Sequence, residues 1–566
     1  MAKLLNMIKD FSGGLSEVAN DNMPNNTLSM AKNVVPGDGY GISRANGTEI
    51  SEYGQALVDV NGTKVGRKIV LLTELELKVN ANSEIWIIAF AEASPTAWNM
   101  LYWDGSVWNT VKDTTATEET VDMPPVKDWF VYANCFYWLD GTHFRRWDGT
   151  KIENMGNNTA SDGWHISIKT ITGEAYTDVD NEFFGKISKA VSVEQRSTRW
   201  YFATTDNEII YSDIGSPETF VNINVINITS GLADSITALH EFSGGILVFQ
   251  KRSVYYLQGY DFASGSDISL DKLNVSTGCS WPKTIKTIEN AVIFMGDNGL
   301  YRLSIPYYST VIATLDISTQ KVSKKLTEGN ILDMTAAVFN SVYYLAKRTE
   351  AGVDEYRYYF KQSSFWGPYT QQPYSYAPRL KGADDLYIGC DNGYILYYDK
   401  NSYHYINTVT GGDTVIQIEA RTKGYDVVGA MVQDAKVKKV YVVLKQYEKE
   451  SSKFSVQLKL DYLDYAYAAD ISSVEDVWNA KVNKDAPTDE SLVWSEGTFS
   501  NSYWGWQDSV VKEFLLNSKC KRVQFIFRDS AIDQPLLIYG VALLYKKKKV
   551  RGSRLGVNET TVVYSN

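Results

Sequence analysis

The sequence predicts an all-β protein whose larger part is a β-propeller of about six to eight blades, followed by a β-sandwich. A unit of two aromatic-rich strands around a polar turn recurs about every 46 residues, and a strand-based period of this length is typical of propellers. Aromatic residues make up 13% of the chain, including 38 Tyr and 15 Trp, which favours strands. Apart from a short helix near the N-terminus, no long stretch shows the apolar period of a helix.

The repeated unit begins at seven positions, and each copy joins two apolar, aromatic strands through a turn. These positions are Ile85, Phe136, Trp200, Ile246, Val292, Val342 and Leu386. A lone two-stranded ribbon is marginally stable in water, so we expect the copies to be parts of larger blades that cover one another around an axis. The bulky residues expected on the buried faces are Trp86, Tyr137, Tyr201, Phe249, Phe294, Tyr344 and Tyr387.

Asp-Gly or Asp-Asn-Gly occupies the turn in four of the copies, at Asp104, Asp140, Asp297 and Asp391. These residue types tolerate the positive φ angles of tight hairpins. A propeller glycosidase would use a pair of carboxylates, and the four aspartates are candidates by residue type alone. Turn chemistry already explains them, and the S-x-D-x-G-x-T-W motif of sialidases is missing. We therefore predict a structural role for all four.

Other regions flank or interrupt the predicted blades. Residues 1–54 are rich in Gly, Asn and Asp and are predicted to form an extended N-terminal arm, with a short helical stretch around Asn26–Lys32. The propeller is predicted over residues 55–410. Residues 150–195 are predicted as a loop insertion on one face of the propeller, where contacts to partners often lie.

Five or six strand patterns after Val415 predict a C-terminal β-sandwich over residues 411–546. Its irregular stretch 470–512 holds four tryptophans. The tail 547–566 is basic and polar, and the run Lys546–Lys549 adds positive charge next to it. This run is either a solvated terminus or a contact for an acidic partner or a nucleic acid.

Residue types that carry chemistry are few and scattered. The cysteines show no CxxC spacing, which is typical of free thiols in a reducing compartment. No two histidines have the spacing of metal ligands or of a catalytic pair, and the HExxH, GxSxG, P-loop and Rossmann glycine motifs do not occur. We therefore predict that the chain is not an enzyme and binds no cofactor. We also predict no catalytic, cofactor-binding or metal-binding residue. The residues concerned are Cys135, Cys279, Cys390, Cys520, His143, His165, His240 and His404.

The segment Asp178–Glu182 resembles the start of a calcium-binding loop. An EF-hand loop needs glycine at its sixth position and glutamate at its twelfth. Phe183 and Lys189 stand at these two positions, so we predict no bound cation there.

The formal net charge is −11, whereas proteins that grip nucleic-acid phosphates are normally basic. An acidic surface aids solubility. It would also let DNA move along the protein, because each contact of a Lys or Arg side chain to a phosphate adds binding affinity that must be overcome. The first residues have too short an apolar stretch for a signal peptide, and no run has the length of a membrane span. We expect synthesis and folding in a cytoplasm, without a membrane span.

Four short segments stand in the same order as in one known family. They are DFSGGL (10–15), the N-x-L-S-x-A-K-N-V segment Asn26–Val34, IIYSDIGSPETF (209–220), and RTKGYDV with KVKKVYV within 421–442. Their order along the chain makes the resemblance more specific than any one of them does. With these segments the chain resembles the tail nozzle, or tail tubular, proteins that stabilise packaged DNA in short-tailed bacteriophages.

The resemblance implies a structural virion protein that forms a ring of six copies below the portal and adaptor proteins. Such a ring continues the DNA channel, retains the packaged genome and docks tail fibres or other tail proteins. Double-stranded DNA would pass through the lumen without sequence-specific binding. The implied location is the phage tail, after synthesis and assembly in the cytoplasm of the bacterial host. No segment resembles a channel-gating loop, so no gate residue is predicted.

Two other functions remain open at this point. A receptor- or glycan-binding propeller of a virion would use Trp and Tyr side chains to stack on sugars, and a propeller glycosidase would use paired carboxylates. A monomer that binds glycans through one pocket would favour the first function. Turnover of a glycan that one carboxylate substitution abolishes would favour the second.

Overall fold

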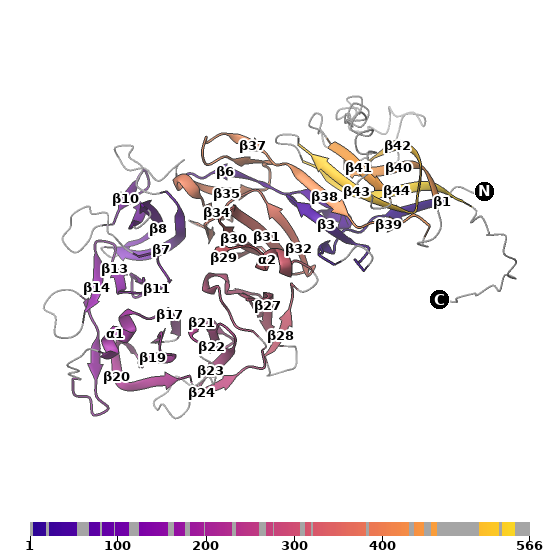
Figure 1. Cartoon of the computed structure of the whole chain (residues 1–566). Helices are drawn as coiled ribbons and strands as arrows, with labels where there is room; N and C mark the ends of the chain where they lie inside the picture. Colours follow the sequence, from indigo (N-terminus) through magenta and orange to yellow (C-terminus); the bar gives the residue numbers. More distant parts are fainter. Residues whose placement is uncertain are drawn as a thin grey trace, which may run out of the picture. The chain divides into compact units, whose positions relative to one another are not determined.

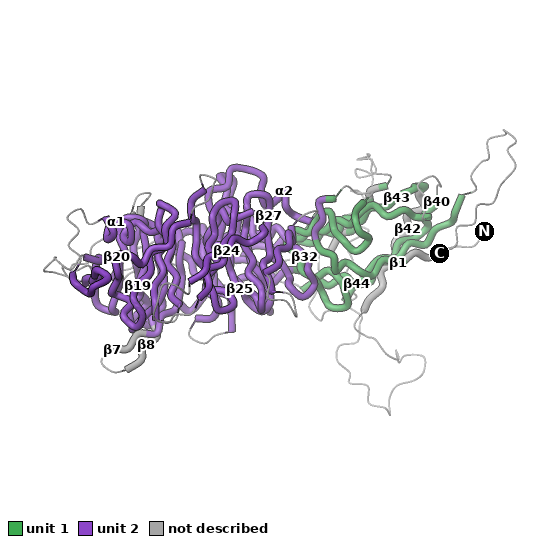
Figure 2. The backbone as a smooth tube through the Cα atoms, turned by 90° about the horizontal axis from the view of Figure 1, so that it is seen from below, with its two compact units in different colours: residues 1–14, 18–44, 417–566 green, residues 15–17, 45–416 purple. Residues whose placement is uncertain are grey.

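The computed structural model divides the chain into two compact units (Figure 2). The sandwich unit comprises residues 1–14, 18–44 and 417–566, and the propeller unit comprises residues 15–17 and 45–416. The structure describes residues 4–18, 22–53, 67–79, 82–94, 97–111, 124–156, 164–175, 182–196, 198–228, 234–259, 268–275, 277–305, 312–318, 321–380, 384–428, 435–445, 454–460, 509–530 and 535–548.

The propeller unit consists of seven sheets arranged around a common axis (Figure 1), which confirms the predicted fold class. Blade 1 holds β7 (Ile69–Val79), β8 (Asn82–Ser94), β9 (Ala97–Trp103) and β10 (Trp108–Thr110). Blade 2 holds β11 (Asp128–Tyr132), β12 (Cys135–Leu139), β13 (Phe144–Trp147), β14 (Ile152–Gly156) and the added β15 (Trp164–His165). Blade 3 holds β17 (Ser192–Arg196), β18 (Arg199–Ala203), β19 (Glu208–Asp213), β20 (Ser216–Asn227) and the added β16 (Ser167–Lys169).

The other four blades follow the same meander of antiparallel strands. Blade 4 holds β21 (Ile236–Phe242), β22 (Gly245–Gln250), β23 (Val254–Gln258) and β24 (Ser269–Lys272). Blade 5 holds β25 (Lys286–Ile288), β26 (Ala291–Gly296), β27 (Gly299–Ser304) and β28 (Ala313–Asp316). Blade 6 holds β29 (Ile331–Phe339), β30 (Val342–Thr349), β31 (Gly352–Tyr359) and β32 (Ser364–Tyr369). Blade 7 holds β33 (Ser375–Pro378), β34 (Leu386–Gly389), β35 (Ile395–Asp399) and β6 (Gly47–Ile50).

Each predicted repeat start lies in the second strand of a blade, from β8 in blade 1 to β34 in blade 7. Five of the seven aromatic residues predicted to be buried are buried, whereas Trp86 and Tyr344 are half-buried. The aromatic rings of the second strands pack against residues of neighbouring blades. Tyr137 of blade 2, for example, lies with its ring centroid 5.1 Å from that of Trp200 in blade 3. The period was visible because every blade needs bulky residues at the same place in its second strand.

The ring of blades closes through a strand from the other end of the propeller unit. Strand β6 pairs antiparallel with β35, with Thr48 opposite Tyr398 and Ile50 opposite Leu396. Blade 7 therefore combines residues near position 50 with residues near position 390. These residues were predicted to lie in the N-terminal arm, and that prediction is wrong for Gly47–Ile50. Hydrogen bonding across β6 and β35 offsets the entropy of joining distant segments.

The sandwich unit contains two sheets, and strands from both ends of the chain contribute to each. The first sheet has the order β4 (Val34–Pro36), β5 (Ile42–Arg44), β44 (Leu537–Lys547), β40 (Ala435–Lys445) and β42 (Ser509–Cys520), with β1 (Leu4–Ile8) also on β44. The second has β3 (Thr27–Lys32), β38 (Ile418–Thr422), β43 (Arg522–Asp529) and β39 (Tyr425–Asp426), with β41 (Phe454–Leu460) also on β43. A buried ion pair joins Arg44 at the end of β5 to Asp529 at the end of β43, at 2.5 Å.

The described residues before position 45, apart from 15–17, thus contribute strands to the sandwich unit rather than an extended arm, and the helix predicted around Asn26–Lys32 is wrong. That segment forms β3, whose Leu28 lies opposite Thr422 and whose Lys32 lies opposite Glu419 of β38. Leu, Met, Ala and Lys favour a helix locally, but the ladder to β38 satisfies the backbone in a strand. Tertiary pairing therefore outweighs the local preference here.

Other predicted regions are only partly described. The range 150–195 begins with β14 and ends with β17, so its ends belong to blades rather than to a loop insertion, and between them lie β15, β16 and helix α1 (Glu182–Ser188). Asp178 and most of the stretch 470–512 lie outside the described residues, as does the tail from residue 549. The remaining short elements are β2 (Gly14–Leu15), η1 (Asp38–Tyr40), η3 (Pro282–Thr284), α2 (Ser323–Thr327), η4 (Asp391–Gly393), β36 (His404–Ile406) and β37 (Asp413–Val415).

Candidate functional site

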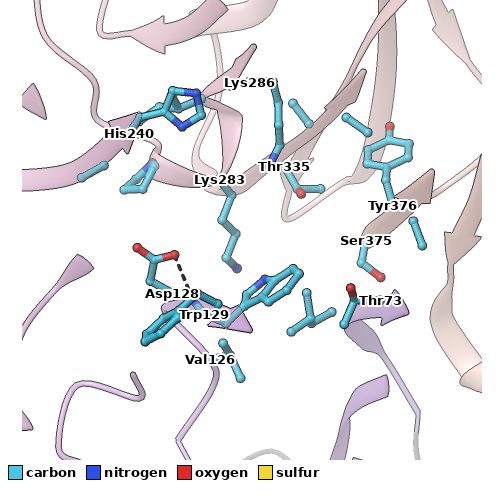
Figure 3. Close-up of a pocket in the computed structure, with 18 of the residues that line it drawn as sticks. Thr73, Val126, Asp128, Trp129, His240, Lys283, Lys286, Thr335, Ser375 and Tyr376 are labelled. Atoms are coloured by element: carbon cyan, nitrogen blue, oxygen red, sulfur yellow. Dashed lines mark hydrogen bonds between the residues drawn. The ribbon is translucent and has the colours of Figure 1, made fainter. Parts of the chain in front are cut away.

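A cavity of about 660 Å³ lies on the axis of the propeller unit (Figure 3). Residues from the innermost strand of every blade line it, namely β7, β11, β17, β21, β25, β29 and β33. Solvent reaches this axial cavity, because Lys127, Pro282, Thr287 and Pro378 at its rim are exposed. A cavity of this size is in the range of small-molecule sites, about 300–1,000 Å³.

One wall of the axial cavity carries ionisable side chains at a repeated position. Glu194 of β17, His240 of β21 and Lys286 of β25 are each 46 residues apart. They occupy the same register in their blades, because their cross-strand partners are Tyr201, Leu247 and Ile293, the second residues of three successive repeat units. Successive inner strands therefore bring the three side chains to one wall.

Asp128, the first residue of β11, joins this wall from blade 2. Its Oδ2 accepts hydrogen bonds from Ser192 Oγ at 2.5 Å and from the Val193 N–H at 3.0 Å. Its Oδ1 accepts a hydrogen bond from the Trp129 N–H at 2.9 Å. Burial raises the pKa of Asp128, and these hydrogen bonds and the charge of Lys286 offset part of that rise. Both carboxylate oxygens thus accept hydrogen bonds, and the two bonds to Oδ2 tie blade 2 to blade 3.

Glu194 holds a proton at neutral pH. Burial raises its pKa to about 8, with smaller contributions from the negative charges of Asp128 and Glu241. Its Oε2 accepts a hydrogen bond from the Glu241 N–H at 3.1 Å, which ties blade 3 to blade 4. The side chain therefore presents a carboxylic acid, which can both donate and accept hydrogen bonds.

His240 is neutral at physiological pH. Burial and the nearby Lys286 lower its pKa to about 4. One ring nitrogen, Nε2, lies 2.8 Å from Thr287 Oγ1 of blade 5. The imidazole therefore joins two blades without adding charge to the axial cavity.

Lys286 makes no hydrogen bond or ion pair with any residue that the structure describes. Burial lowers the pKa of its ammonium, and the charge of Asp128 opposes that effect. The charges of Asp128 and Lys286 are of opposite sign, and each favours the charged form of the other while burial opposes it. Lys283 is different, because its ammonium is paired with Asp333 at 3.0 Å.

The opposite wall carries small, neutral side chains from blades 6, 7 and 1. Thr335, Ser375 and Thr73 supply hydroxyl groups there, and Ala336 and Ala377 leave space beside them (Figure 3). The indole of Trp129 is half-buried and lies between the two walls, as Figure 3 shows. The axial cavity thus combines an aromatic face with hydrogen-bond donors and acceptors. Its lining carries charged side chains of both signs, and Glu74, Lys127 and Arg379 belong to it as well.

The four turn aspartates lie in turns of four different blades, so the structure brings no two of them together. Asp104 accepts hydrogen bonds from the N–H groups of Val107 and Ser106, which lower its pKa to about 2. For Asp140, burial raises the pKa, but hydrogen bonds from Thr142 and His143 and the charge of Arg145 lower it overall. The predicted turn chemistry is confirmed at both residues, and the following glycines have φ of +105° and +90°.

The remaining candidates are dispersed. The cysteines are free, and three of the four are buried. His143 lies in the Asp140 turn, His165 in β15 and His404 in β36, so only His240 faces the axial cavity. Sequence reasoning missed Asp128, Glu194 and Lys286. The identical spacing of 46 residues from Glu194 to His240 and on to Lys286 is the signal that could have found the last two.

The described residues contain no group of three or more His, Cys, Asp or Glu side chains that could hold a metal ion. The α-helices found in that part of the chain have seven and five residues, and neither could cross a membrane. Asp128 and Glu194 are two interacting carboxylates, as in glycosidases, but the oxygens of Asp128 are already hydrogen-bonded within the protein.

No protein-family model matches the chain, and no curated protein matches its sequence. Among solved structures, the extracellular domain of a B. thetaiotaomicron protein described as a one-component system matches with a TM-score of 0.41 and 11% identity, over 77% of this chain and 59% of that chain. The WD40 β-propeller domain of Doa1 matches with a TM-score of 0.35 and 6% sequence identity, over 63% of this chain and 97% of that domain. The computationally designed Ika8 protein matches with a TM-score of 0.32 and 11% sequence identity, over 69% of this chain and 100% of that chain. At these values we transfer no function from them.

Proposed function

We propose that this chain is a structural protein of a phage tail, which forms a ring that continues the DNA channel below the portal and adaptor proteins. In this proposal the ring retains the packaged genome and docks tail fibres. The observation that carries the proposal is the ordered set of four segments that resemble tail nozzle proteins. Copy number, expected to be six, follows from that resemblance alone.

The first two of these segments serve the fold of the sandwich unit. Phe11 of DFSGGL is fully buried, and its N–H donates a hydrogen bond to the Tyr40 carbonyl at 2.9 Å. Asn33, in the second segment, adopts a φ of 55° and donates from Nδ2 to the Gln417 carbonyl at 2.7 Å. These residues join the start of the chain to its C-terminal strands. Motifs that maintain the fold rather than a reactive site support a structural role.

The third segment forms the hairpin of β19 and β20 in blade 3. Within it, Ser212 Oγ accepts a hydrogen bond from the Trp200 N–H at 2.8 Å, and Gly215 adopts a φ of 68° in the turn. Ser212 thus has a structural partner inside blade 3, and Glu218 of the same segment accepts a hydrogen bond from Trp164 Nε1 of blade 2 at 2.8 Å. This too favours a scaffold over an enzyme.

The axial cavity bears on the route of the DNA in this proposal. Its volume is about 660 Å³, and the side chains of all seven blades enclose it. The major groove of B-DNA alone is about 12 Å wide, so a duplex does not fit inside one propeller. DNA would therefore pass between the copies of the ring, and the propellers would form part of its wall.

Electron microscopy of the purified full-length chain, and of virions that contain it, tests the proposal. We expect a closed ring with six-fold symmetry and a lumen wide enough for duplex DNA. Particles that lack only this chain should lose packaged DNA, which can be measured as nuclease-sensitive DNA after packaging. Particles that lack it and still retain their DNA, or a chain that stays monomeric beside its portal and adaptor, would contradict the proposal.

A further inference from the structure

We propose that the axial cavity is a binding site for a neutral saccharide of one or two rings, held by Trp129, Glu194 and Lys286. This inference goes beyond the proposed ring function, because a channel wall needs no ligand site. It rests on three features of the cavity, namely its size and access, one aromatic face, and a polar wall with charges of both signs. A receptor-derived or free sugar would present the same chemistry.

Size and access fit a small ligand. The volume of about 660 Å³ lies in the range of small-molecule sites, and the small side chains of Ala336, Ala337 and Ala377 are among those that line the cavity. Exposed rim residues, among them Pro282 and Pro378, leave a path from solvent. One or two sugar rings are within the range of ligands for a cavity of this size.

Trp129 provides the aromatic face. The Phe136 ring supports it, with the two centroids 5.5 Å apart, and the indole extends into the axial cavity (Figure 3). Indole has a large apolar surface and a polar N–H, which is why Trp suits ligands that are apolar on one side and hydroxylated at the edge. The C–H face of a pyranose ring has this character.

The polar wall supplies hydrogen bonds without a dominant charge. Lys286 has three donors and no partner among the described residues, while Glu194 carries a proton that it can donate. Lys286 is half-buried, so a ligand hydroxyl group that accepts a hydrogen bond from its ammonium would add an interaction in a partly dehydrated site. Sugar hydroxyls both donate and accept, and they match such a mixed wall.

Charged ligands fit this wall less well. An anion would meet Asp128, whose carboxylate lies on the same wall as Lys286. A cation would meet the ammonium groups of Lys283 and Lys286. No cluster of three metal-ligating residues occurs among the described residues, which argues against a metal ion in that part of the chain. The neutral ligand is thus the one that neither sign of charge opposes.

Saturation-transfer NMR on the purified full-length chain tests the inference. The ligands are glucose, galactose, N-acetylglucosamine, maltose and lactose, with glucuronate and glucosamine as charged counterparts. We expect saturable binding of at least one neutral sugar, at least ten-fold tighter than its charged counterpart. Trp129→Ala should weaken it at least ten-fold, and Trp129→Phe should weaken it less because a ring remains on Phe136.

Glu194→Ala and Glu208→Ala form a matched pair in blade 3. Glu208 lies outside the axial cavity in an ion pair with Lys186 at 2.9 Å, so its substitution should leave sugar binding unchanged. Glu194→Ala removes both the donor and the acceptor of the carboxylic acid and should weaken binding, and circular dichroism melting would verify that both variants fold. No binding of any neutral sugar, or binding that survives both Trp129→Ala and Glu194→Ala, overturns the inference. Ring assembly, measured on the same samples, reports on the proposed function separately.

Discussion

At the scale of single residues, Glu355 and Arg357 on β31 form a buried pair of opposite charges in the propeller. Both are buried, and Arg357 Nε donates to Glu355 Oε1 at 2.7 Å. The guanidinium also lies over the rings of Tyr369 and Tyr398, at 4.0 and 4.7 Å from their centroids, and Tyr376 of blade 7 donates to Glu355 at 3.2 Å. The pair thus links blade 6 to blade 7.

Arg357→Met should lower the stability of the propeller strongly, because it leaves the Glu355 carboxylate buried without its cation. Breaking a buried pair in this way costs about 3–5 kcal/mol. Arg379→Met is the matched control, since Arg379 and Asp384 form an exposed pair at 3.2 Å, and such pairs contribute roughly 0–1 kcal/mol. Thermal unfolding measures both. Equal shifts of the two variants would contradict this reading of the buried pair.

Glu194 should make the propeller less stable as the pH rises from about 5 to 8. Its pKa is raised to about 8 in the folded protein, so the folded state holds a proton that the unfolded state releases above its ordinary pKa near 4.5. The associated stability is fully present below pH 4.5 and is lost as pH rises through about 8. Wild type should therefore lose thermal stability relative to Glu194→Gln between pH 5 and 8. A constant difference across this range would rule the assignment out, and Glu208→Gln serves as control.

At the scale of elements, helix α2 shows how a very short helix can persist. Isolated helices of five residues are unstable, because nucleation is costly. At its start, the Glu17 carboxylate accepts from the Lys324 and Lys325 N–H groups, both at 2.9 Å. At its end, the buried Lys347 ammonium donates to the Lys325 and Glu328 carbonyls, both at 2.6 Å. Side chains from other segments therefore satisfy the helix ends.

Glu17→Ala should speed hydrogen exchange at the amides of Lys324 and Lys325, because it removes their acceptors. Loss of a helix cap costs about 0.5–2 kcal/mol, which corresponds to a several-fold faster exchange. Glu350→Ala is the control, since Glu350 accepts a hydrogen bond from the exposed Asn330 at 2.8 Å and does not contact α2 in any described interaction. Exchange at Lys324 and Lys325 that is unaffected by Glu17→Ala would show that the cap is not needed.

At the scale of the whole propeller, closure depends on β6 reaching blade 7 without obstruction. A Cβ atom at Gly47 would lie 1.9 Å from the His404 carbonyl oxygen, which is backbone and cannot move aside readily. Gly47→Ala should therefore open blade 7 and lower the thermal midpoint. At Gly185 in α1 no atom lies within 4 Å of such a Cβ, so Gly185→Ala should be neutral or stabilise by roughly 0.5–1 kcal/mol. A midpoint for Gly47→Ala equal to wild type would contradict closure by β6.

The sequence by itself determined the propeller, because every blade repeats the same local demand. Bulky residues recur in the second strands, and Asp-Gly turns such as Asp140 with Gly141 recur where φ must be positive. It also predicted a structural role for the turn aspartates, since turn chemistry is local. Asp104 illustrates this, because its carboxylate accepts hydrogen bonds from Ser106, Val107 and Asn109, all within five residues of it.

Only the tertiary structure decided which distant segments pair. Gly47–Ile50 completes blade 7, β3 pairs with β38 instead of forming a helix, and Arg44 meets Asp529 across nearly the whole chain. The wall of Glu194, His240 and Lys286 likewise exists only once the inner strands stand side by side. The physical reason is that these contacts gain their free energy from backbone ladders and burial between segments far apart in sequence, which leave no local period to read.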